Sequence, residues 1–195
     1  RGYDSAGIAI INSETKKIVC NKAEGKLKYL KNIVKNTEIP GTVGIGHTRW
    51  ATHGKPEVKN AHPHIDSSGK VAVVQNGIIE NYQELKTKLE KEGIVFNSDT
   101  DTEVIPHLIQ KELIALNKLK LENNGSTLLV AVRNVISDLE GSYALAVIWA
   151  GAPDSLVVAR RQAPLIIGLG EGEFICASDT PAIADFTKII LPMED

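Results

Sequence analysis

Several residue types that mark common protein classes are scarce in this chain. Its two cysteines, Cys20 and Cys176, stand far apart among 195 residues, so neither a zinc ribbon nor a disulfide framework is indicated, and reduced cytosolic thiols are expected. The formal net charge of −2 comes without a basic run, which argues against a nucleic-acid-binding surface. No apolar run approaches the ~20 residues of a membrane-spanning helix, and no signal peptide precedes the first expected strand. We expect a cytoplasmic protein that contacts neither nucleic acid nor membrane.

The composition is that of an ordinary globular protein, with 43% hydrophobic and 24% charged residues. We find no internal repeat and no low-complexity segment, and we expect one domain over residues 1–195. Strands come first, helices occupy the middle and strands return at the end, which is typical of an α+β fold. The apolar pattern predicts strands at 8–11, 16–21, 42–46, 71–74, 94–96, 143–149, 155–159, 165–169, 173–177 and 186–191, and helices at 27–34, 81–92, from 98–103 to about 116, and 127–139.

The segment from Gly44 to Gly54 changes abruptly from apolar to polar. A short apolar strand leads into Arg49 and Trp50, with two threonines and two histidines close by. A loop at the end of a buried strand is a common place for binding groups. The alternative is a polar turn in which Trp50 covers the core. The segment alone favours neither interpretation.

Arg49 and Asp101 are suited to bind a free α-amino acid. A guanidinium binds a carboxylate through two hydrogen bonds, and a carboxylate binds an ammonium group. Arg49 ends an expected strand and Asp101 begins an expected helix, so both can face one pocket. The alternatives are a helix-capping role for Asp101, which local sequence favours, and a surface ion pair for Arg49.

Asn76 and Gly77 allow two interpretations. The asparagine amide and the glycine N–H could form an oxyanion hole, which stabilises negative charge on a substrate oxygen. Asn-Gly between apolar runs is also the strongest short signal for a β-hairpin turn. The local sequence favours the turn.

Four of the five histidines lie close together in sequence, at His47, His53, His62 and His64, and a metal-dependent hydrolase is therefore an alternative. No carboxylate or cysteine stands at a recognised ligand spacing beside them, so structural histidines in a polar loop are favoured. The irregular stretch 55–68 around them is long enough to be functional or disordered. Neither cysteine has the surroundings of a nucleophile, because Cys176 lies in an apolar strand and the other in a lysine-rich one.

Five segments in order resemble the glutaminase domain of glutamine–fructose-6-phosphate aminotransferases, which are type 2 glutamine amidotransferases with an N-terminal nucleophile. The resemblance extends over nearly the whole chain. Each segment alone is moderately specific, and the five together are very specific. They are residues 1–7, 47–54, 60–64, 76–82 and 98–104.

The resemblance implies an α+β fold, a four-layer αββα sandwich of the N-terminal-nucleophile hydrolase type that is incomplete at its N-terminus. It implies hydrolysis of L-glutamine to L-glutamate without a cofactor or a metal. Arg49 would bind the α-carboxylate of glutamine and Asp101 its ammonium group, while Asn76 and Gly77 would form the oxyanion hole. The resemblance further implies a pocket lined by Trp50, Thr52 and His53, and a nucleophile bordered by Arg1 and Gly2.

The chain departs from the family at the nucleophile. The family uses a cysteine at the N-terminus of the mature chain, with the free α-amine as base, a short distance upstream of the turn that here contains Arg1. A guanidinium is neither a nucleophile nor a base at neutral pH, so Arg1 cannot replace that cysteine. We therefore expect these 195 residues to be a fragment of a longer protein.

The implied parent enzyme passes ammonia to fructose 6-phosphate and makes glucosamine 6-phosphate for amino-sugar synthesis. Its partners would be L-glutamine, L-glutamate and a sugar-phosphate isomerase domain of the same chain, with a homodimer formed through that domain. Two alternatives stay open. One is an amidotransferase of the phosphoribosyl-pyrophosphate type, and the other is an inactive glutamine- or glutamate-binding module.

Overall fold

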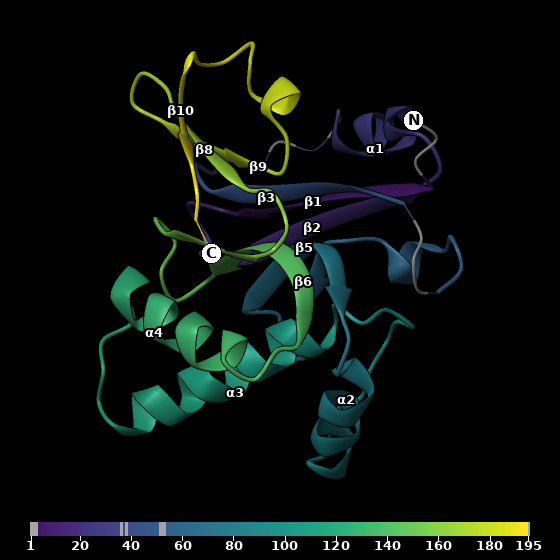
Figure 1. The fold of residues 1–195 in the computed structure, drawn as a ribbon, viewed down its shortest axis with the longest axis vertical. Helices are drawn as coiled ribbons and strands as arrows, with labels where there is room; N and C mark the ends of the chain where they lie inside the picture. Colours follow the sequence, from purple (N-terminus) through teal and green to yellow (C-terminus); the bar gives the residue numbers. More distant parts are fainter. Residues whose placement is uncertain (1–3, 36, 38, 51–53, 195) are drawn as a thin grey trace.

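Two antiparallel sheets stacked face to face form the centre of the molecule (Figure 1). The computed structural model describes residues 4–35, 37, 39–50 and 54–194. In the first sheet β1 lies between β2 and β3, and in the second the order is β4-β5-β6-β7. The strands are β1 (Ser5–Ile11), β2 (Ile18–Glu24), β3 (Gly44–Arg49), β4 (His64–Ile65), β5 (Val71–Ile79), β6 (Gly141–Trp149) and β7 (Leu156–Arg161).

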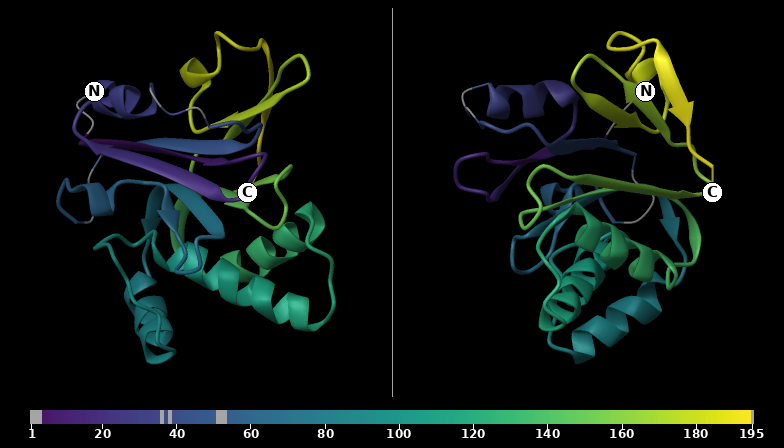
Figure 2. Two further views of the ribbon diagram at one scale, coloured as in Figure 1. Left: turned by 180° about the vertical axis from the view of Figure 1, so that it is seen from behind. Right: turned by 90° about the vertical axis from the view of Figure 1, so that its left-hand side faces the viewer.

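Helices cover the outer faces of both sheets (Figures 1 and 2). On the first sheet, Leu30 of α1 packs on Ala6 and Ala23. On the second sheet, three helices bury a larger core against β5 and β6. The order of helix, sheet, sheet and helices confirms the predicted α+β fold with four αββα layers. The helices are α1 (Leu27–Val34), α2 (Tyr82–Lys91), α3 (Val104–Lys118) and α4 (Gly125–Ile136).

The period of two along β5 explains why its first four residues, 71–74, are all apolar. Ala72 and Val74 point into the core between the two sheets, where they meet Ala9 and Ile45 of the first sheet. Residues 71 and 73 point to the opposite face and pack against the helices. A strand buried on both faces needs apolar residues at every position.

A third, smaller sheet lies beyond the first sheet (Figure 1). It has the order β10-β8-β9, formed by β8 (Ile166–Leu169), β9 (Phe174–Ala177) and β10 (Ile189–Pro192). Two short 3-10 helices, η1 (Val58–Asn60) and η2 (Thr180–Ala182), complete the fold. In the part of the chain that the structure describes, every helix is too short or too polar to cross a bilayer.

Two local sequence predictions are wrong. Residues 76 and 77 lie inside β5, paired with β6, so the hairpin turn is not there. Residues 94–96 form no strand. The predicted end of the helix at Gly93 is confirmed, because this residue has a φ of +88° and its N–H donates to Glu90 O (3.0 Å).

Asn81 and Glu84 have the sequence spacing of a capping box at the start of α2, but this box is not formed, because Asn81 has other partners. Its Nδ2 donates to Asp138 O (2.8 Å), and the backbone N–H of Glu140 donates to its Oδ1 (3.1 Å). The side chain therefore ties the start of α2 to the segment before β6. It does not cap its own helix, whose N-cap has no side-chain hydrogen bond.

Candidate functional site

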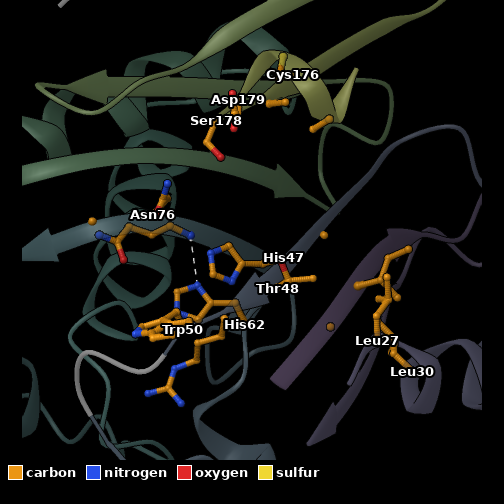
Figure 3. A pocket seen from close by; sticks show the side chains of 18 of the residues that line it. Leu27, Leu30, His47, Thr48, Trp50, His62, Asn76, Cys176, Ser178 and Asp179 are labelled. Carbon is orange, nitrogen blue, oxygen red and sulfur yellow. Dashed lines mark hydrogen bonds between the residues drawn. The ribbon is translucent and has the colours of Figure 1, made fainter. Parts of the chain in front are cut away.

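One cavity collects the predicted site residues that the structure describes. Its volume is about 1310 Å³, and it lies between β3, β5, the turn before α3 and the segment that follows β9. Figure 3 shows side chains from these elements facing a common space. The predicted Thr52, His53, Arg1 and Gly2 lie outside the described residues. The predicted residues on the cavity wall are Arg49, Trp50, Asn76, Gly77 and Asp101.

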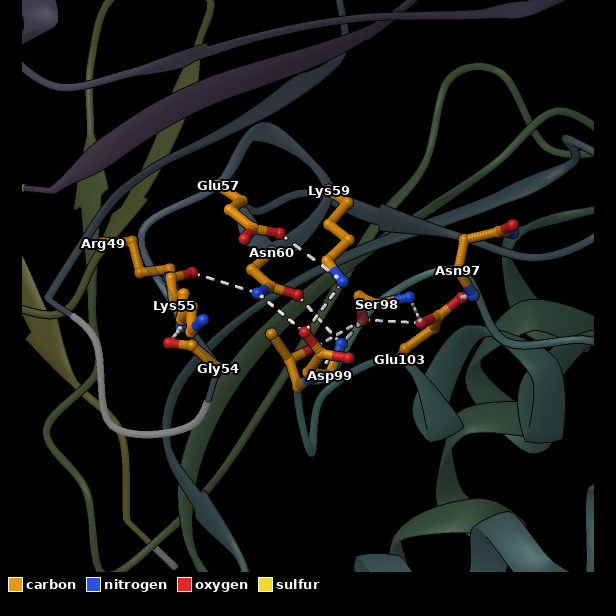
Figure 4. Close-up of polar contacts among 11 residues, drawn as sticks. Arg49, Gly54, Lys55, Glu57, Lys59, Asn60, Asn97, Ser98, Asp99 and Glu103 are labelled. Atoms are coloured by element: carbon orange, nitrogen blue, oxygen red, sulfur yellow. Dashed lines mark hydrogen bonds and ion pairs between the residues drawn. The ribbon is translucent and has the colours of Figure 1, made fainter.

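Arg49 is buried at the end of β3, and the chain that follows holds its guanidinium (Figure 4). Nη2 donates to Gly54 O (3.1 Å) and Nη1 to Lys55 O (3.3 Å), and Asp4 Oδ1 lies 3.4 Å from Nη1. With its side chain only 5% exposed, Arg49 is not a surface ion-pair residue. Trp50 is 63% exposed, so it does not cover the core. The two alternatives for this segment, a surface ion pair at Arg49 and a turn in which Trp50 covers the core, are therefore wrong.

Asn60 connects the Arg49 loop to the turn that carries Asp101. Asn60 is fully buried, and its Nδ2 donates to Lys55 O (3.0 Å) and Asp99 Oδ2 (3.3 Å). Its Oδ1 accepts from the backbone N–H of Asp99 (2.8 Å). One side chain thus holds together two segments that are about forty positions apart in sequence (Figure 4).

Hydrogen bonds at the two ends of β5 reveal which of its amides face β6. Ala150 N donates to Lys70 O (2.9 Å), and Glu80 N donates to Glu140 O (2.9 Å). Residues 70 and 150, and residues 80 and 140, lie directly opposite each other. They continue the register of β5 and β6, in which Val71 pairs with Trp149 and Ile79 with Gly141. In an antiparallel pair such bonded positions alternate along the strand. The even-numbered amides of β5 therefore point to β6, and the odd-numbered amides point away from it.

The odd-numbered amides of β5 point to the edge that faces the site. Gln75 N donates to His62 Nδ1 (3.2 Å), and Ile79 N donates to Asp101 Oδ2 (2.8 Å). Gly77 lies midway between them, so the same alternation directs its N–H to this edge. The backbone thus presents the Gly77 N–H between a histidine on one side and Asp101 on the other, where a ligand oxygen can accept from it.

Asn76 and Gly77 meet the structural demands of an oxyanion hole. Asn76 is exposed and lies on the same face of β5 as residues 72 and 74, the face turned to the first sheet. Gly77 has a φ of +130°, and a Cβ there would lie 2.1 Å from Ser142 O. Only glycine fits this backbone, which accounts for the residue type without a hairpin turn.

Asp101 is 3% exposed and is not a helix cap. The N-cap of α3 is Glu103, and Asp101 Oδ2 accepts the β5 hydrogen bond described above. Among the described residues, no cationic side chain forms an ion pair with Asp101. A buried carboxylate is costly unless a cation or several donors compensate it. A ligand ammonium group in the cavity would supply that compensation.

The three described histidines of the predicted cluster pack on one another and do not converge on a common point. The ring centroids of His47 and His62 are 4.4 Å apart and stacked, and those of His62 and His64 are 4.8 Å apart and perpendicular. Burial lowers the pKa of all three, and for His47, where Arg49 adds to the effect, to about 4. Within the described ranges, no group of three or more histidine, cysteine or acidic side chains is arranged to hold a metal ion. Their arrangement supports the structural interpretation.

Neither cysteine has a nucleophile's environment. Burial raises the pKa of the Cys20 thiol, with a smaller opposing effect of Lys22, and burial also raises the pKa of Cys176. Cys176 lies on the cavity wall, but Figure 3 shows its sulfur directed away from Asn76. A thiol that is protonated at neutral pH is a poor nucleophile.

The cavity wall after β9 was missed by the sequence analysis. Ser178 and Asp179 are exposed there, opposite His47 in Figure 3. The available signal was a pair of polar residues directly after an apolar strand, the same pattern that drew attention to the end of β3. The buried partners Gln75 and Thr102 were also missed, because hydrogen-bonded core residues leave no pattern in the sequence.

Comparisons with known proteins agree with this geometry. A family model described as a glutamine amidotransferase domain matches residues 47–185. Glutamine–fructose-6-phosphate aminotransferase [isomerizing] of Thermosynechococcus vestitus is 56% identical over 195 residues, which is 100% of this chain and 30% of that protein. The chain therefore spans less than a third of the length of this relative.

Solved structures show the same architecture. Glutamine phosphoribosylpyrophosphate amidotransferase of B. subtilis superposes with a TM-score of 0.71 and 29% identity, over 94% of this chain and 37% of that one. A protein described as the allosteric regulatory enzyme of purine biosynthesis gives a TM-score of 0.75 and 28% identity, over 98% and 39%. Both superpose on nearly the whole of this chain, which has the N-terminal-nucleophile hydrolase fold. The chain belongs to the glutamine amidotransferase domain family.

Proposed function

We propose that this chain is the glutaminase part of a cytoplasmic glutamine–fructose-6-phosphate aminotransferase. It hydrolyses L-glutamine to L-glutamate and supplies the ammonia to fructose 6-phosphate, which becomes glucosamine 6-phosphate. The observation that carries the proposal is that Arg49, Asn76, Gly77 and Asp101 line one cavity. The relative at 56% identity favours this acceptor sugar over the phosphoribosyl-pyrophosphate type, whose solved structure is 29% identical.

The ligand is bound at three points. Arg49 receives the α-carboxylate, because a guanidinium binds a carboxylate with two parallel hydrogen bonds. Asp101 receives the ammonium group and gains the cation that its buried carboxylate lacks among the described residues. The side-chain amide then reaches the β5 edge, where the oxygen accepts from the Asn76 amide and the Gly77 N–H.

Hydrolysis proceeds through attack on the side-chain carbonyl carbon. A nucleophile adds to this carbon, and the carbonyl oxygen becomes an oxyanion that Asn76 and Gly77 stabilise. The bond to nitrogen then breaks, the nitrogen takes up a proton, and ammonia leaves. Water releases the acyl group as L-glutamate. The nucleophile that the family resemblance implies is a cysteine upstream of Arg1, since burial holds the thiols of Cys20 and Cys176 protonated at neutral pH.

We also propose the partners that the resemblance implies. They are a sugar-phosphate isomerase domain in the same chain, which accepts the ammonia, and a second copy of the protein bound through that domain. The extent of the relative supports this proposal, since 70% of its length lies outside the matched region and leaves room for a second domain.

Calorimetric titration of the full-length protein with L-glutamate tests the proposal. Asp101→Asn keeps an oxygen that can accept from Ile79 N but removes the charge, so we expect at least about tenfold weaker binding, the worth of one charge-assisted hydrogen bond. The matched control is Asp154→Asn, which makes the same chemical change on an exposed side chain that does not line the cavity. Binding by Asp101→Asn within twofold of the unmodified protein would refute the ammonium site.

A further inference from the structure

A buried polar cluster lies directly behind the proposed binding groups. It contains the chain neighbours of two of these groups, Asn76 and Asp101. Gln75 precedes Asn76, and Thr100 and Thr102 flank Asp101. All three side chains are buried. Thr100 contacts His64 and Thr102 contacts His62 through their hydroxyl groups, and Gln75 contacts His62 through its backbone N–H.

The contacts around His62 form a closed circuit of hydrogen bonds. The backbone N–H of Gln75 donates to His62 Nδ1 (3.2 Å), so this ring nitrogen carries no proton. Thr102 Oγ1 donates its one hydrogen to Gln75 Oε1 (2.8 Å), so it can only accept at its contact with His62 Nε2 (3.4 Å). The imidazole is therefore neutral, with its proton on Nε2. Each of the three groups has a fixed role in the circuit.

A second pair of the same kind lies on the other side of Asp101. His64 Nε2 and Thr100 Oγ1 are 3.0 Å apart, and Thr100 Oγ1 also lies 2.9 Å from Ser98 Oγ. The turn that carries Asp101 is thus held at the residue before it and the residue after it. Both contacts come from the segment that contains His62 and His64.

We propose that His62 is a positioning residue which, through Thr102 and the backbone of Gln75, fixes Asp101 and the Gly77 N–H relative to each other. The circuit joins the edge of β5 to the turn before α3, and these are the two elements that carry the oxyanion donor and the ammonium acceptor. Burial of the three polar groups makes the circuit stiff, because any one of them loses a costly hydrogen bond if it moves. This inference rests on the proposed function.

The test compares two ligands in the full-length protein. L-glutamate has an ammonium group, and glutarate has the same two carboxylates without it. The ratio of their dissociation constants therefore reports the ammonium contact alone. Thr102→Val keeps the size of the side chain but removes the hydroxyl. We expect the dissociation constant for L-glutamate to rise by a factor at least about five times larger than the factor for glutarate. Thr102→Ser keeps the hydroxyl and should leave the ratio within about twofold of the unmodified protein.

A purely structural role would lower the melting temperature of Thr102→Val and change both affinities in equal proportion. An unchanged ratio in a folded Thr102→Val protein therefore overturns the inference. If Thr102→Val does not fold, Gln75→Met breaks the same hydrogen bond from the other side, with the same expected outcome.

Asp101→Asn distinguishes a failure of the positioning role from a failure of the proposed function. If this variant changes the ratio and the Thr102 and Gln75 variants do not, only the positioning role fails. If Asp101→Asn also leaves it unchanged, the proposed function fails.

Discussion

Gly77 provides a backbone N–H donor at a position where the backbone conformation and the nearby atoms allow only glycine. Its positive φ and the nearness of Ser142 O are separate reasons, and each excludes a side chain. The donor that we assign to the oxyanion hole is therefore built into the path of β5. Its position does not depend on a flexible side chain.

We predict that Gly77→Ala destabilises the protein strongly. The new Cβ would lie 2.1 Å from a backbone oxygen, and the φ of +130° adds strain, so a loss of at least about 2 kcal/mol in the free energy of unfolding is expected. Gly69→Ala is the control, because Gly69 also has a positive φ (+72°) but open space around it. Urea denaturation measures both. Equal losses in the two variants would contradict the steric argument.

For single residues, the sequence indicated which side chains could be functional better than it indicated what surrounds them in the fold. The Asn-Gly pair had two good interpretations, and the wrong one was locally favoured because hairpin turns and oxyanion holes use the same residues. Asp101 likewise resembled a helix cap, since an aspartate carboxylate can serve either as a helix cap or as an ammonium acceptor. The pairing of β5 with β6 rules out the turn, and the start of α3 at an N-cap of Glu103 rules out the cap. Neither property is local.

The element that supports the site most directly is the polar segment 60–64, with the histidines it packs against the first sheet. Its His62 and His64 are buried, and His47 of β3 stacks on His62. Burial holds the pKa of all three below the ordinary value, so the native protein keeps these rings neutral in mild acid.

We predict that the free energy of unfolding falls as the pH drops from about 6.5 toward 4. Above 6.5 these histidines are neutral in both states. Below it the unfolded chain binds protons that the native protein refuses, which favours unfolding by up to about 1.4 kcal/mol per pH unit for each ring. His64→Gln removes one such group and should reduce the slope. Urea denaturation between pH 7 and 4.5 measures it, and stability that is constant or rises with acid would contradict the account.

Elements with a strong apolar period were predicted well. The helices expected at 27–34 and 127–139 are close to the observed α1 and α4. The strand expected at 71–74 begins where β5 begins, but β5 continues to Ile79. The helix expected from 98–103 begins only at Val104, because Glu103 turns back to accept from Asn97 N (2.9 Å) and Ser98 N (2.7 Å). That turn puts Asp101 at the cavity, and no periodicity could indicate it.

For the whole molecule, the order of the elements predicted the α+β class, and the family resemblance predicted the four αββα layers, but the order of the elements did not predict the position of the site. The cavity is assembled from β3, β5, the turn before α3 and the segment after β9, which are distant in sequence. The chemistry of a free α-amino acid suggested that Arg49 and Asp101 could face one pocket, and only the family resemblance added Asn76 to them in advance. The physical reason is that the stacking of two sheets, and not any local signal, sets which strand ends meet.

The most direct test of the central claim is a crystal structure of the full-length protein with L-glutamate bound. We expect one glutamate in the cavity, with its α-carboxylate at Arg49, its ammonium group at Asp101, and its side-chain carboxylate within hydrogen-bonding distance of Asn76 Nδ2 and Gly77 N. A glutamate bound in the opposite direction, or in a different cavity, would contradict the account.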